Sequence, residues 1–208
     1  GARIRCGNCC TCYEKFTARE NLNYFGSLYD RPLRSTEELL RMVGLENDGD
    51  KKVSDFSKGM RSRLNFIKAL VHNPDILFLD EPTSGLDPTN SRLMKDIILA
   101  EKKRGKTIII TTHNMFDATE LCDQVAFIVS GKVSALDTPH NLIMSRGAAK
   151  IRYSYFENGE KTGECMLTQT ADDKRLNELI QSNSLRSVHS SEPTLNDIFV
   201  DITGRTLQ

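Results

Sequence analysis

The fold class follows from Ile76-Leu77-Phe78-Leu79-Asp80-Glu81-Pro82, an apolar run closed by two carboxylates and a proline. A short apolar run bounded by a turn signal is typical of a strand that is buried on both faces, as in a parallel sheet. Asp80 and Glu81 then lie at the carboxyl end of that strand, which is where open α/β sheets bind their ligands. We therefore expect an α/β protein with a site beside these two acids.

The segments on either side of this strand alternate between helix and strand signals. Upstream, an apolar stripe at helical spacing begins near Ser57. Downstream, Asp87-Pro88 is expected to begin a helix that Gly105 ends. Thr107–Thr111 is predicted to be a second buried strand and Val125–Val129 a third. Strands that alternate with helices indicate a parallel sheet covered by helices.

The pattern changes after the third strand, where shorter strands, an Asn158-Gly159 turn and a closing helix from Pro193 are expected. The length agrees, because 208 residues make one domain of about 150 residues with a remainder. We expect a divergent Cys-rich N-terminus (1–16), a main domain (17–146) and a small α+β accessory subdomain (147–208).

Composition and charge exclude several classes of function. Lys and Arg number 28, as do Asp and Glu, so the formal net charge is +0 and nothing indicates nucleic acid as a ligand. No apolar run approaches the roughly 20 residues needed to cross a bilayer, so a membrane role would have to come through a partner. The first residues lack the pattern of a secretory signal, and we expect a cytoplasmic protein.

Three features indicate phosphate chemistry. Ser57-Lys58-Gly59-Met60 opens a helix, so a hydroxyl, a backbone amide and the positive end of the helix dipole can point at a phosphate. Asp80 can hold Mg2+ and Glu81 can polarise an attacking water, although taken alone the two acids could equally begin a solvated loop. His113 follows the second strand, and parallel strands would bring its imidazole to Glu81, whereas a lone histidine at a strand end is usually structural or solvent-facing.

These pieces, in this order, resemble the ATP-binding-cassette (ABC) ATPases, which have a P-loop NTPase-like core. Ser57-Lys58-Gly59-Met60 resembles the family signature and Leu79-Asp80-Glu81-Pro82 the Walker B strand. Ser84-Gly85-Leu86-Asp87 resembles the D-loop and His113 the switch histidine. The resemblance runs from about Tyr13 to the C-terminus, and it implies an ABC ATPase core followed by the α+β appendage.

The resemblance implies ATP and Mg2+ as cofactors and assigns roles to individual residues. Asp80 would serve Mg2+, Glu81 would be the catalytic carboxylate, and His113 would contact the γ-phosphate and its attacking water. Family members work as head-to-tail dimers with a second cassette. Ser57-Lys58-Gly59-Met60 and Asp87 would therefore contribute to nucleotide binding in a homo- or heterodimer, with the signature acting on ATP held by the opposite subunit.

The signature form with Lys58-Gly59-Met60 and the tail from Glu192 to Phe199 resemble cassettes of the exporter type. In such systems a separate membrane permease exports drugs, lipids or polysaccharides, and the cassette is peripheral to the inner face of the cell membrane. The surface between residues 17–30 and the segment around Arg31-Pro32 would face the permease's coupling helix.

The sequence given lacks the family's Walker A motif, a Gly-rich phosphate loop between a strand and a helix. Gly105-Lys106-Thr107 resembles the end of that motif, but it follows a predicted helix and leads into a predicted strand. We therefore expect a helix end and a strand start there. The Q-loop glutamine is also missing, because Cys9-Cys10-Thr11-Cys12-Tyr13 occupies its segment. The missing lobe is truncated, divergent or supplied by another chain.

Four of the six cysteines crowd together at Cys6, Cys9, Cys10 and Cys12. They are too close to form loop-closing disulfides, so reduced thiols are expected. Four thiolates can bind zinc or an iron-sulfur cluster, but two adjacent thiols with no distant second pair make an awkward site. A thiol-rich N-terminus without a metal is the preferred interpretation.

Three functions remain open. The leading hypothesis is an ATP-binding and ATP-hydrolysing subunit that energises an ABC exporter. The second is a non-hydrolysing module that donates its signature and D-loop to a competent partner cassette, which the missing phosphate loop favours. The third is a soluble ABC ATPase acting on ribosomes or DNA, against which the neutral charge counts.

Overall fold

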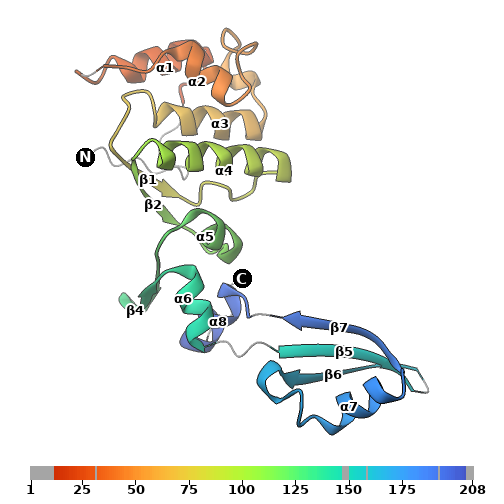
Figure 1. The fold of residues 1–208 in the computed structure, drawn as a ribbon. Coiled ribbons are helices and arrows are strands. Elements are labelled where there is room, and N and C mark those ends of the chain that lie inside the picture. The colour runs from red at the N-terminus through yellow and green to blue at the C-terminus, as the bar shows by residue number, and fades with distance from the viewer. Residues whose placement is uncertain (1–11, 31, 147–149, 158, 192, 205–208) are drawn as a thin grey trace. The chain divides into compact units, whose positions relative to one another are not determined.

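The computed structural model describes residues 12–30, 32–146, 150–157, 159–191 and 193–204 (Figure 1). Contacts within the chain divide it into two compact units, Gly1–His113 and Asn114–Gln208. Helices and strands occur in both units, which confirms the expected α/β class. The expected boundaries at residues 16 and 146 stay a prediction.

The first unit consists of helices and one small sheet. In chain order its elements are α1 (Ala18–Gly26), α2 (Thr36–Met42), the short 3₁₀ helix η1 (Val53–Asp55), α3 (Lys58–Lys68), β1 (Ile76–Asp80), α4 (Pro88–Lys103) and β2 (Thr107–Thr111). α4 contacts both α3 and β2. The core is mainly aliphatic, and its fully buried side chains include Leu22, Leu39, Leu64, Leu79 and Met94.

The two strands of this unit pair in parallel, with Ile76 opposite Thr107 and Asp80 opposite Thr111. Their carboxyl ends therefore meet at one edge, as the sequence predicted. This register places the residues that follow β1 beside the residues that follow β2.

The expectation that both strands are buried on both faces is wrong. Leu77 and Leu79 are buried, but Ile76 is 42% exposed, and the residues of β2 alternate between exposed and half-buried. The physical reason is that, within the described residues, β1 and β2 pair only with each other. A two-stranded parallel sheet keeps both of its outer edges open, and here only one side of β1 is covered.

Side-chain caps fix the starts of α3 and α4. The Ser57 hydroxyl accepts a hydrogen bond from the Met60 amide at 3.2 Å, and the Asp87 carboxylate accepts one from the Asn90 amide at 3.0 Å. Such caps satisfy N–H groups that have no partner within the helix. Both predicted helix starts are confirmed.

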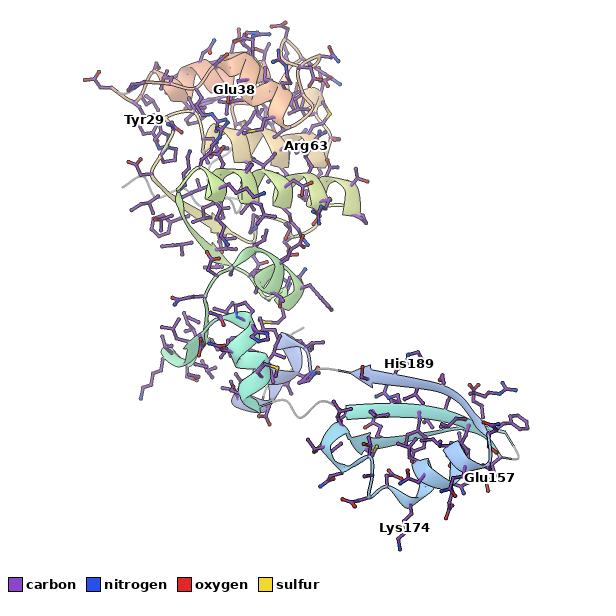
Figure 2. All side chains as sticks on the ribbon, viewed as in Figure 1. Tyr29, Glu38, Arg63, Glu157, Lys174 and His189 are labelled. Carbon is purple, nitrogen blue, oxygen red and sulfur yellow. The ribbon has the colours of Figure 1, made fainter. Side chains whose placement is uncertain are left out.

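Gly105-Lys106-Thr107 is a helix end and a strand start, as expected. The Lys106 ammonium lies 2.7 Å from Glu101 Oε2, and these side chains are 8% and 0% exposed. Glu101 also accepts a hydrogen bond from Arg34 at 2.7 Å, and Arg34 in turn contacts Glu38, which is labelled in Figure 2. The lysine of the Gly105-Lys106-Thr107 sequence is therefore paired with a buried carboxylate.

The second unit begins with a helix and a hairpin. Its first elements are α5 (Met115–Leu121), β3 (Val125–Val129), β4 (Lys132–Asp137) and α6 (Pro139–Arg146). β3 and β4 pair in an antiparallel fashion, and α8 (Leu195–Thr203) joins them from the far end of the chain. Their shared core contains Met115, Ala118, Val125, Phe127, Leu142, Leu195 and Ile198.

The rest of the second unit is a three-stranded antiparallel sheet in the order β6-β5-β7. Its elements are β5 (Lys150–Phe156), β6 (Glu160–Met166), the 3₁₀ helix η2 (Leu167–Gln169), α7 (Lys174–Gln181) and β7 (Leu185–Ser191). Leu176 and Leu179 of α7 pack on Tyr153 of β5. Strands and a helix therefore pack together here, while the expected accessory subdomain of residues 147–208 stays a prediction.

Within the described residues, every helix is too short or too polar to span a lipid bilayer.

Candidate functional site

The carboxyl ends of β1 and β2 bring Glu81 and His113 into contact. Glu81 Oε1 lies 2.8 Å from Nδ1 of the His113 ring and accepts a hydrogen bond from the His113 backbone amide at 2.9 Å. The Thr112 hydroxyl approaches the other oxygen, Oε2, at 3.4 Å. The juxtaposition predicted from parallel strands is confirmed, and three groups from the end of β2 now orient one carboxylate.

Asp80 is oriented by the residue opposite to it in the sheet. The hydroxyl of Thr111 donates a hydrogen bond to Asp80 Oδ1, which leaves the second oxygen, Oδ2, open in an exposed side chain. The register that pairs Asp80 with Thr111 makes this contact possible. Sequence reasoning missed Thr111, although its position followed from two strands of equal length that end together.

The backbone at Glu81 is strained. Glu81 has a φ of +47°, in the left-handed region that residues other than glycine rarely adopt. Its amide donates a hydrogen bond to the Thr111 carbonyl at 2.9 Å, which ties the strained residue to the end of β2. Strain of this kind costs about 1–3 kcal/mol and is concentrated at functional sites.

The Glu81–His113 pair is open to solvent. The His113 side chain is 56% exposed and that of Glu81 is 33% exposed. With Nδ1 of His113 facing Glu81, the other ring nitrogen, Nε2, is left for a ligand. The pair can therefore act on a water molecule and a phosphate that reach it from outside the unit.

The predicted signature residues and D-loop form a second group. Lys58 at the start of α3 lies against Gly85, and Gly59 lies against the Asn90 side chain. Asn90 also donates to Asp87 from its side-chain amide at 2.5 Å. Hydrogen bonds from the backbone and side chain of Asn90 lower the pKa of Asp87 below its ordinary value, so Asp87 is ionised at neutral pH.

A short turn connects the two groups along the chain, and backbone hydrogen bonds stabilise it. The Ser84 amide donates to the Glu81 carbonyl at 3.2 Å, and the Leu86 amide to the Thr83 carbonyl at 3.3 Å. Sequence reasoning placed the members of both groups but missed Asn90. No sequence signal distinguishes Asn90 from other polar residues in the first turn of a helix.

The residues present fit Mg2+ better than they fit a whole nucleotide. Mg2+ prefers oxygen ligands and keeps several waters, and the open carboxylate oxygen of Asp80 suits that preference. A triphosphate also needs a cradle of backbone amides and a lysine. Lys106 cannot supply that lysine while its ammonium is buried against Glu101.

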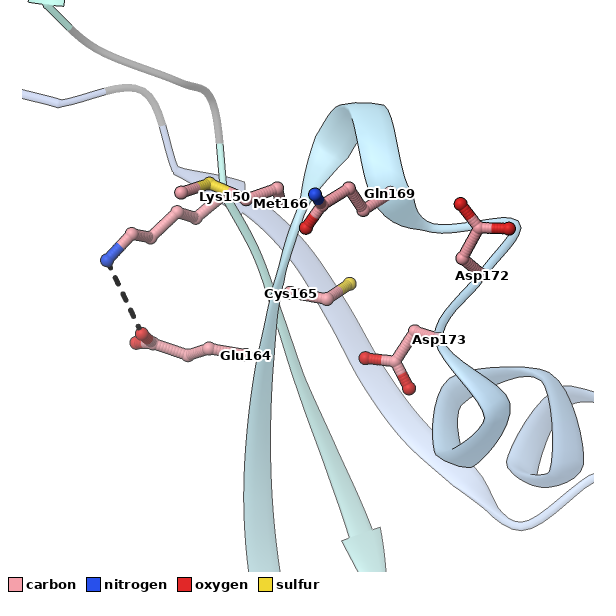
Figure 3. Close-up of a pocket in the computed structure, with 7 residues that line it drawn as sticks. All are labelled: Lys150, Glu164, Cys165, Met166, Gln169, Asp172 and Asp173. Atoms are coloured by element: carbon pink, nitrogen blue, oxygen red, sulfur yellow. Dashed lines mark ion pairs between the residues drawn. The ribbon is translucent and has the colours of Figure 1, made fainter.

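The second unit contains a cavity of about 600 Å³ that is separate from this site (Figure 3). None of the predicted site residues lines it. Its lining carries more negative than positive charge, which does not suit an anionic phosphate. The lining residues are Lys150, Glu164, Cys165, Met166, Gln169, Asp172 and Asp173.

Most of the N-terminal cysteine cluster, Cys6, Cys9 and Cys10, lies outside the described residues. Cys12 is described, and its buried thiol donates a hydrogen bond to Asn65 Oδ1 at 3.1 Å. No group of three or more metal-ligating side chains occurs within the part of the chain that the structure describes. The nature of the cluster stays a prediction.

Residues 14–116 match the protein family described as "AAA domain, putative AbiEii toxin, Type IV TA system". The chain is 45% identical over 197 residues to the fluoroquinolones export ATP-binding protein of Mycobacterium tuberculosis (strain CDC 1551 / Oshkosh), which covers 94% of this chain. The aligned part is 65% of that relative, so the chain spans slightly less than two thirds of its length.

A second relative is the Nod factor export ATP-binding protein I of Burkholderia lata. It is 36% identical over 212 residues, which cover 93% of this chain and 69% of the relative. A solved structure described as "Structure of ATP binding subunit of ABC transporter" superposes with a TM-score of 0.60 and 26% sequence identity. The superposition covers 68% of this chain and 61% of that structure.

Proposed function

Since the chain belongs to the family of ABC transporter ATP-binding proteins, we propose that it hydrolyses ATP to energise an exporter, as one half of a head-to-tail dimer. The observation that carries the proposal is the Glu81–His113 pair at the end of a parallel sheet. A carboxylate held by a histidine can position and deprotonate an attacking water, and a second carboxylate beside it can serve Mg2+, so the arrangement suits phosphoryl transfer to water.

Each residue of the site has a role in this proposal. Asp80 would hold Mg2+, directly or through its waters, and Thr111 fixes the orientation of the carboxylate. Glu81 accepts a proton from the attacking water, and the contacts from His113 keep its carboxylate aimed. Nε2 of His113 contacts the γ-phosphate, and when the ring is protonated on both nitrogens it donates there and stabilises the charge that develops. Bound ATP supplies the phosphoryl group, and bound Mg2+ neutralises its charge.

The signature and D-loop act on the nucleotide of a second cassette. The Ser57 hydroxyl, the Gly59 amide and the positive end of α3 are close together at one exposed helix start. Met60 completes this first turn by donating its amide to Ser57. Asp87 lies on the neighbouring turn. The two cassettes are copies of this chain or of a related one.

The phosphate loop comes from a segment outside residues 12–204. Two observations support this part of the proposal. Lys106 is occupied by Glu101, so the chain's own Gly-Lys-Thr sequence does not serve. The relatives also extend beyond the part that matches this chain. The open edges of the β1–β2 sheet, with Ile76 and Ile109 each more than 40% exposed, suit an added apolar strand.

The partner in the membrane is a permease that binds near α1 on the cytoplasmic side. Aromatic side chains gather there: Tyr13 lies 5.2 Å from both Phe16 and Tyr24, measured between ring centroids. All three are more than a third exposed. Exposed aromatic residues in a group are typical of protein interfaces. Arg31, the other residue expected at this surface, lies outside the described residues.

One observation favours the alternative of a non-hydrolysing module. The signature, D-loop, Walker B and switch residues are all present, while the one candidate phosphate lysine is buried in an ion pair. A cassette built in this way could still donate Ser57 and Gly59 to a competent partner. It would then bind no ATP in the site beside Glu81.

The test is phosphate release by the natural full-length protein in its membrane complex, with and without Glu81→Gln. The substitution removes the base and preserves the shape of the side chain. Turnover should fall by a factor of about 10² to 10⁴. Nucleotide should still bind with similar affinity. Unchanged phosphate release would contradict the role of Glu81, and the absence of ATP hydrolysis by the unmodified complex would favour the non-hydrolysing alternative.

A further inference from the structure

The start of α3 and the Ser84–Asp87 turn fit together around two glycines. A Cβ added to Gly85 would lie 3.1 Å from Lys58 Nζ, and Gly85 has a φ of +68°. A Cβ added to Gly59 would lie 3.2 Å from Asn90 Nδ2. A side chain at Gly85 would displace the end of the Lys58 side chain, and one at Gly59 would crowd the Asn90 amide. Because glycine has no side chain, Lys58 can lie against Gly85 and Asn90 can lie against Gly59.

Asn90 is held in place from its own side of this contact. Its backbone amide and side-chain amide donate to the two oxygens of Asp87, at 3.0 and 2.5 Å. These bonds form the cap at the start of α4. The atom that faces Gly59 therefore belongs to a fixed group, and Gly59 meets a defined surface.

Lys58 occupies a position that the helix itself disfavours. It is the first residue of α3, where the partial positive charge of the helix dipole repels a cation. The first turn of α3 contains no acidic residue to offset this charge. The Lys58 ammonium extends to the Ser84–Asp87 turn and lies next to Gly85.

We propose that Lys58 is a positioning residue, which ties the start of α3 to the Ser84–Asp87 turn so that both are presented to the opposite cassette as one surface. This inference rests on the proposed function, because it concerns the signature and D-loop of that site. This contact would keep Ser57 and Gly59 at a fixed position relative to Asp87. Contacts made across a dimer then form together, and catalysis at the partner's nucleotide depends on that geometry.

The first experiment measures hydrogen exchange in the chain described here and requires no nucleotide. Lys58→Ala should increase exchange of the Leu86 amide several-fold, because the turn loses its tie to α3. Lys58→Arg should preserve most of the protection, since arginine keeps the cation and a similar reach. Lys103→Ala removes the same charge from an exposed position at the end of α4 and should change nothing at Leu86. Equal protection in Lys58→Ala and the unmodified chain would overturn the proposal.

The second experiment measures ATP hydrolysis by the full-length protein in its complex. Lys58→Ala should lower kcat about fivefold or more and leave KM for ATP nearly unchanged, with recovery in Lys58→Arg. An increase in KM alone would mean that Lys58 contacts the nucleotide directly, and would overturn the positioning role. If the unmodified complex shows no hydrolysis that depends on Glu81, the proposed function fails. The exchange measurement still decides whether the tie exists.

Discussion

Oε1 of Glu81 accepts a hydrogen bond from the His113 amide at 2.9 Å and lies 2.8 Å from Nδ1 of the same residue. One oxygen of the carboxylate is thus held by both the backbone and the ring of a single residue. A group held in this way loses little freedom when a reaction begins, which is the basis of catalytic preorganisation. The other oxygen, Oε2, faces only the more distant Thr112 hydroxyl and is the better placed to accept a proton.

His113→Ala should therefore slow hydrolysis more than it weakens nucleotide binding. The loss of the ring removes one contact to Glu81 and the donor toward the phosphoryl group, while the backbone contact remains. We expect turnover in the full-length complex to fall by about 10² or more, with a change in nucleotide affinity of less than about threefold. Steady-state phosphate release and nucleotide titration measure the two quantities. His140→Ala, an exposed histidine of α6, is the matched control. Equal losses in turnover and binding would indicate a structural histidine.

Glu101→Gln should destabilise the first unit strongly. The substitution keeps the shape of a fully buried side chain but removes the carboxylate that pairs with both Arg34 and Lys106. Loss of one member of a buried ion pair costs about 3–5 kcal/mol, and a glutamine oxygen recovers part of it. We expect a loss of about 2 kcal/mol or more in the free energy of unfolding, measured with urea. Glu46→Gln, an exposed control, should change it by less than about 0.5 kcal/mol.

The same network predicts how stability depends on pH. Burial by itself would raise the pKa of Glu101, but the contacts from Lys106 and Arg34 outweigh burial and lower the pKa below its ordinary value. A carboxylate with a lowered pKa stabilises the fold above the pKa of the unfolded chain, about 4.3 for glutamate, and loses this effect as pH falls through the folded pKa. The stability difference between the natural chain and Glu101→Gln should therefore be largest at neutral pH and should shrink below about pH 4. A difference that does not vary with pH would contradict this account.

The positions of the candidate site residues could be predicted from the sequence because they follow from strand geometry. Asp80, Glu81 and His113 follow the ends of two strands of equal length, and parallel pairing leaves one arrangement for them. Prediction from the sequence failed where the decisive contacts join distant parts of the chain. Arg34 meets Glu101 across 67 residues, and nothing in either segment indicates the pairing.

Burial was predicted less well than position. The apolar run at Thr107–Thr111 resembles a fully buried strand, yet its side chains alternate between exposed and half-buried. Apolar residues favour the burial of a strand, but whether the strand is buried depends on the helices and strands that pack against it. The contact between Lys58 and Gly85 was also missed, because a lysine beside a glycine in space leaves no periodic pattern in the sequence.

Tyr24→Ala should weaken association with the membrane partner. The Tyr24 ring is 40% exposed and packs edge-on to Tyr13, so truncation removes contact area at the centre of the aromatic group. We expect the variant to be recovered several-fold less well with a polytopic membrane protein from detergent-solubilised membranes. Phe116→Ala, which removes a 74% exposed aromatic ring from the second unit, is the control. Recovery of ribosomes or DNA in place of a membrane protein would favour a soluble ABC ATPase.

Residues 1–208 alone should bind ATP weakly or not at all. Most phosphate contacts in this fold come from stacked amides and a lysine in a Gly-rich loop, and the chain's one Gly-Lys-Thr sequence spans a helix end and a strand start. Its lysine is neutralised by Glu101 at 2.7 Å. The groups that remain beside the site, Asp80 and Glu81, are anionic and repel a triphosphate unless a cation is bound.

Isothermal titration of the folded chain with Mg-ATP should accordingly show no saturable heat in the micromolar range. Lys106→Ala should not alter this result, although it should lower the stability of the unit because Glu101 loses one of its ion-pair partners. Lys103→Ala, which removes an exposed lysine at the end of α4, controls for the loss of positive charge. A micromolar affinity that Lys106→Ala abolishes and Lys103→Ala preserves would mean that Lys106 leaves Glu101 to bind phosphate. In that case the ion pair would be a resting state of a phosphate site, and a second segment would not be needed to supply one.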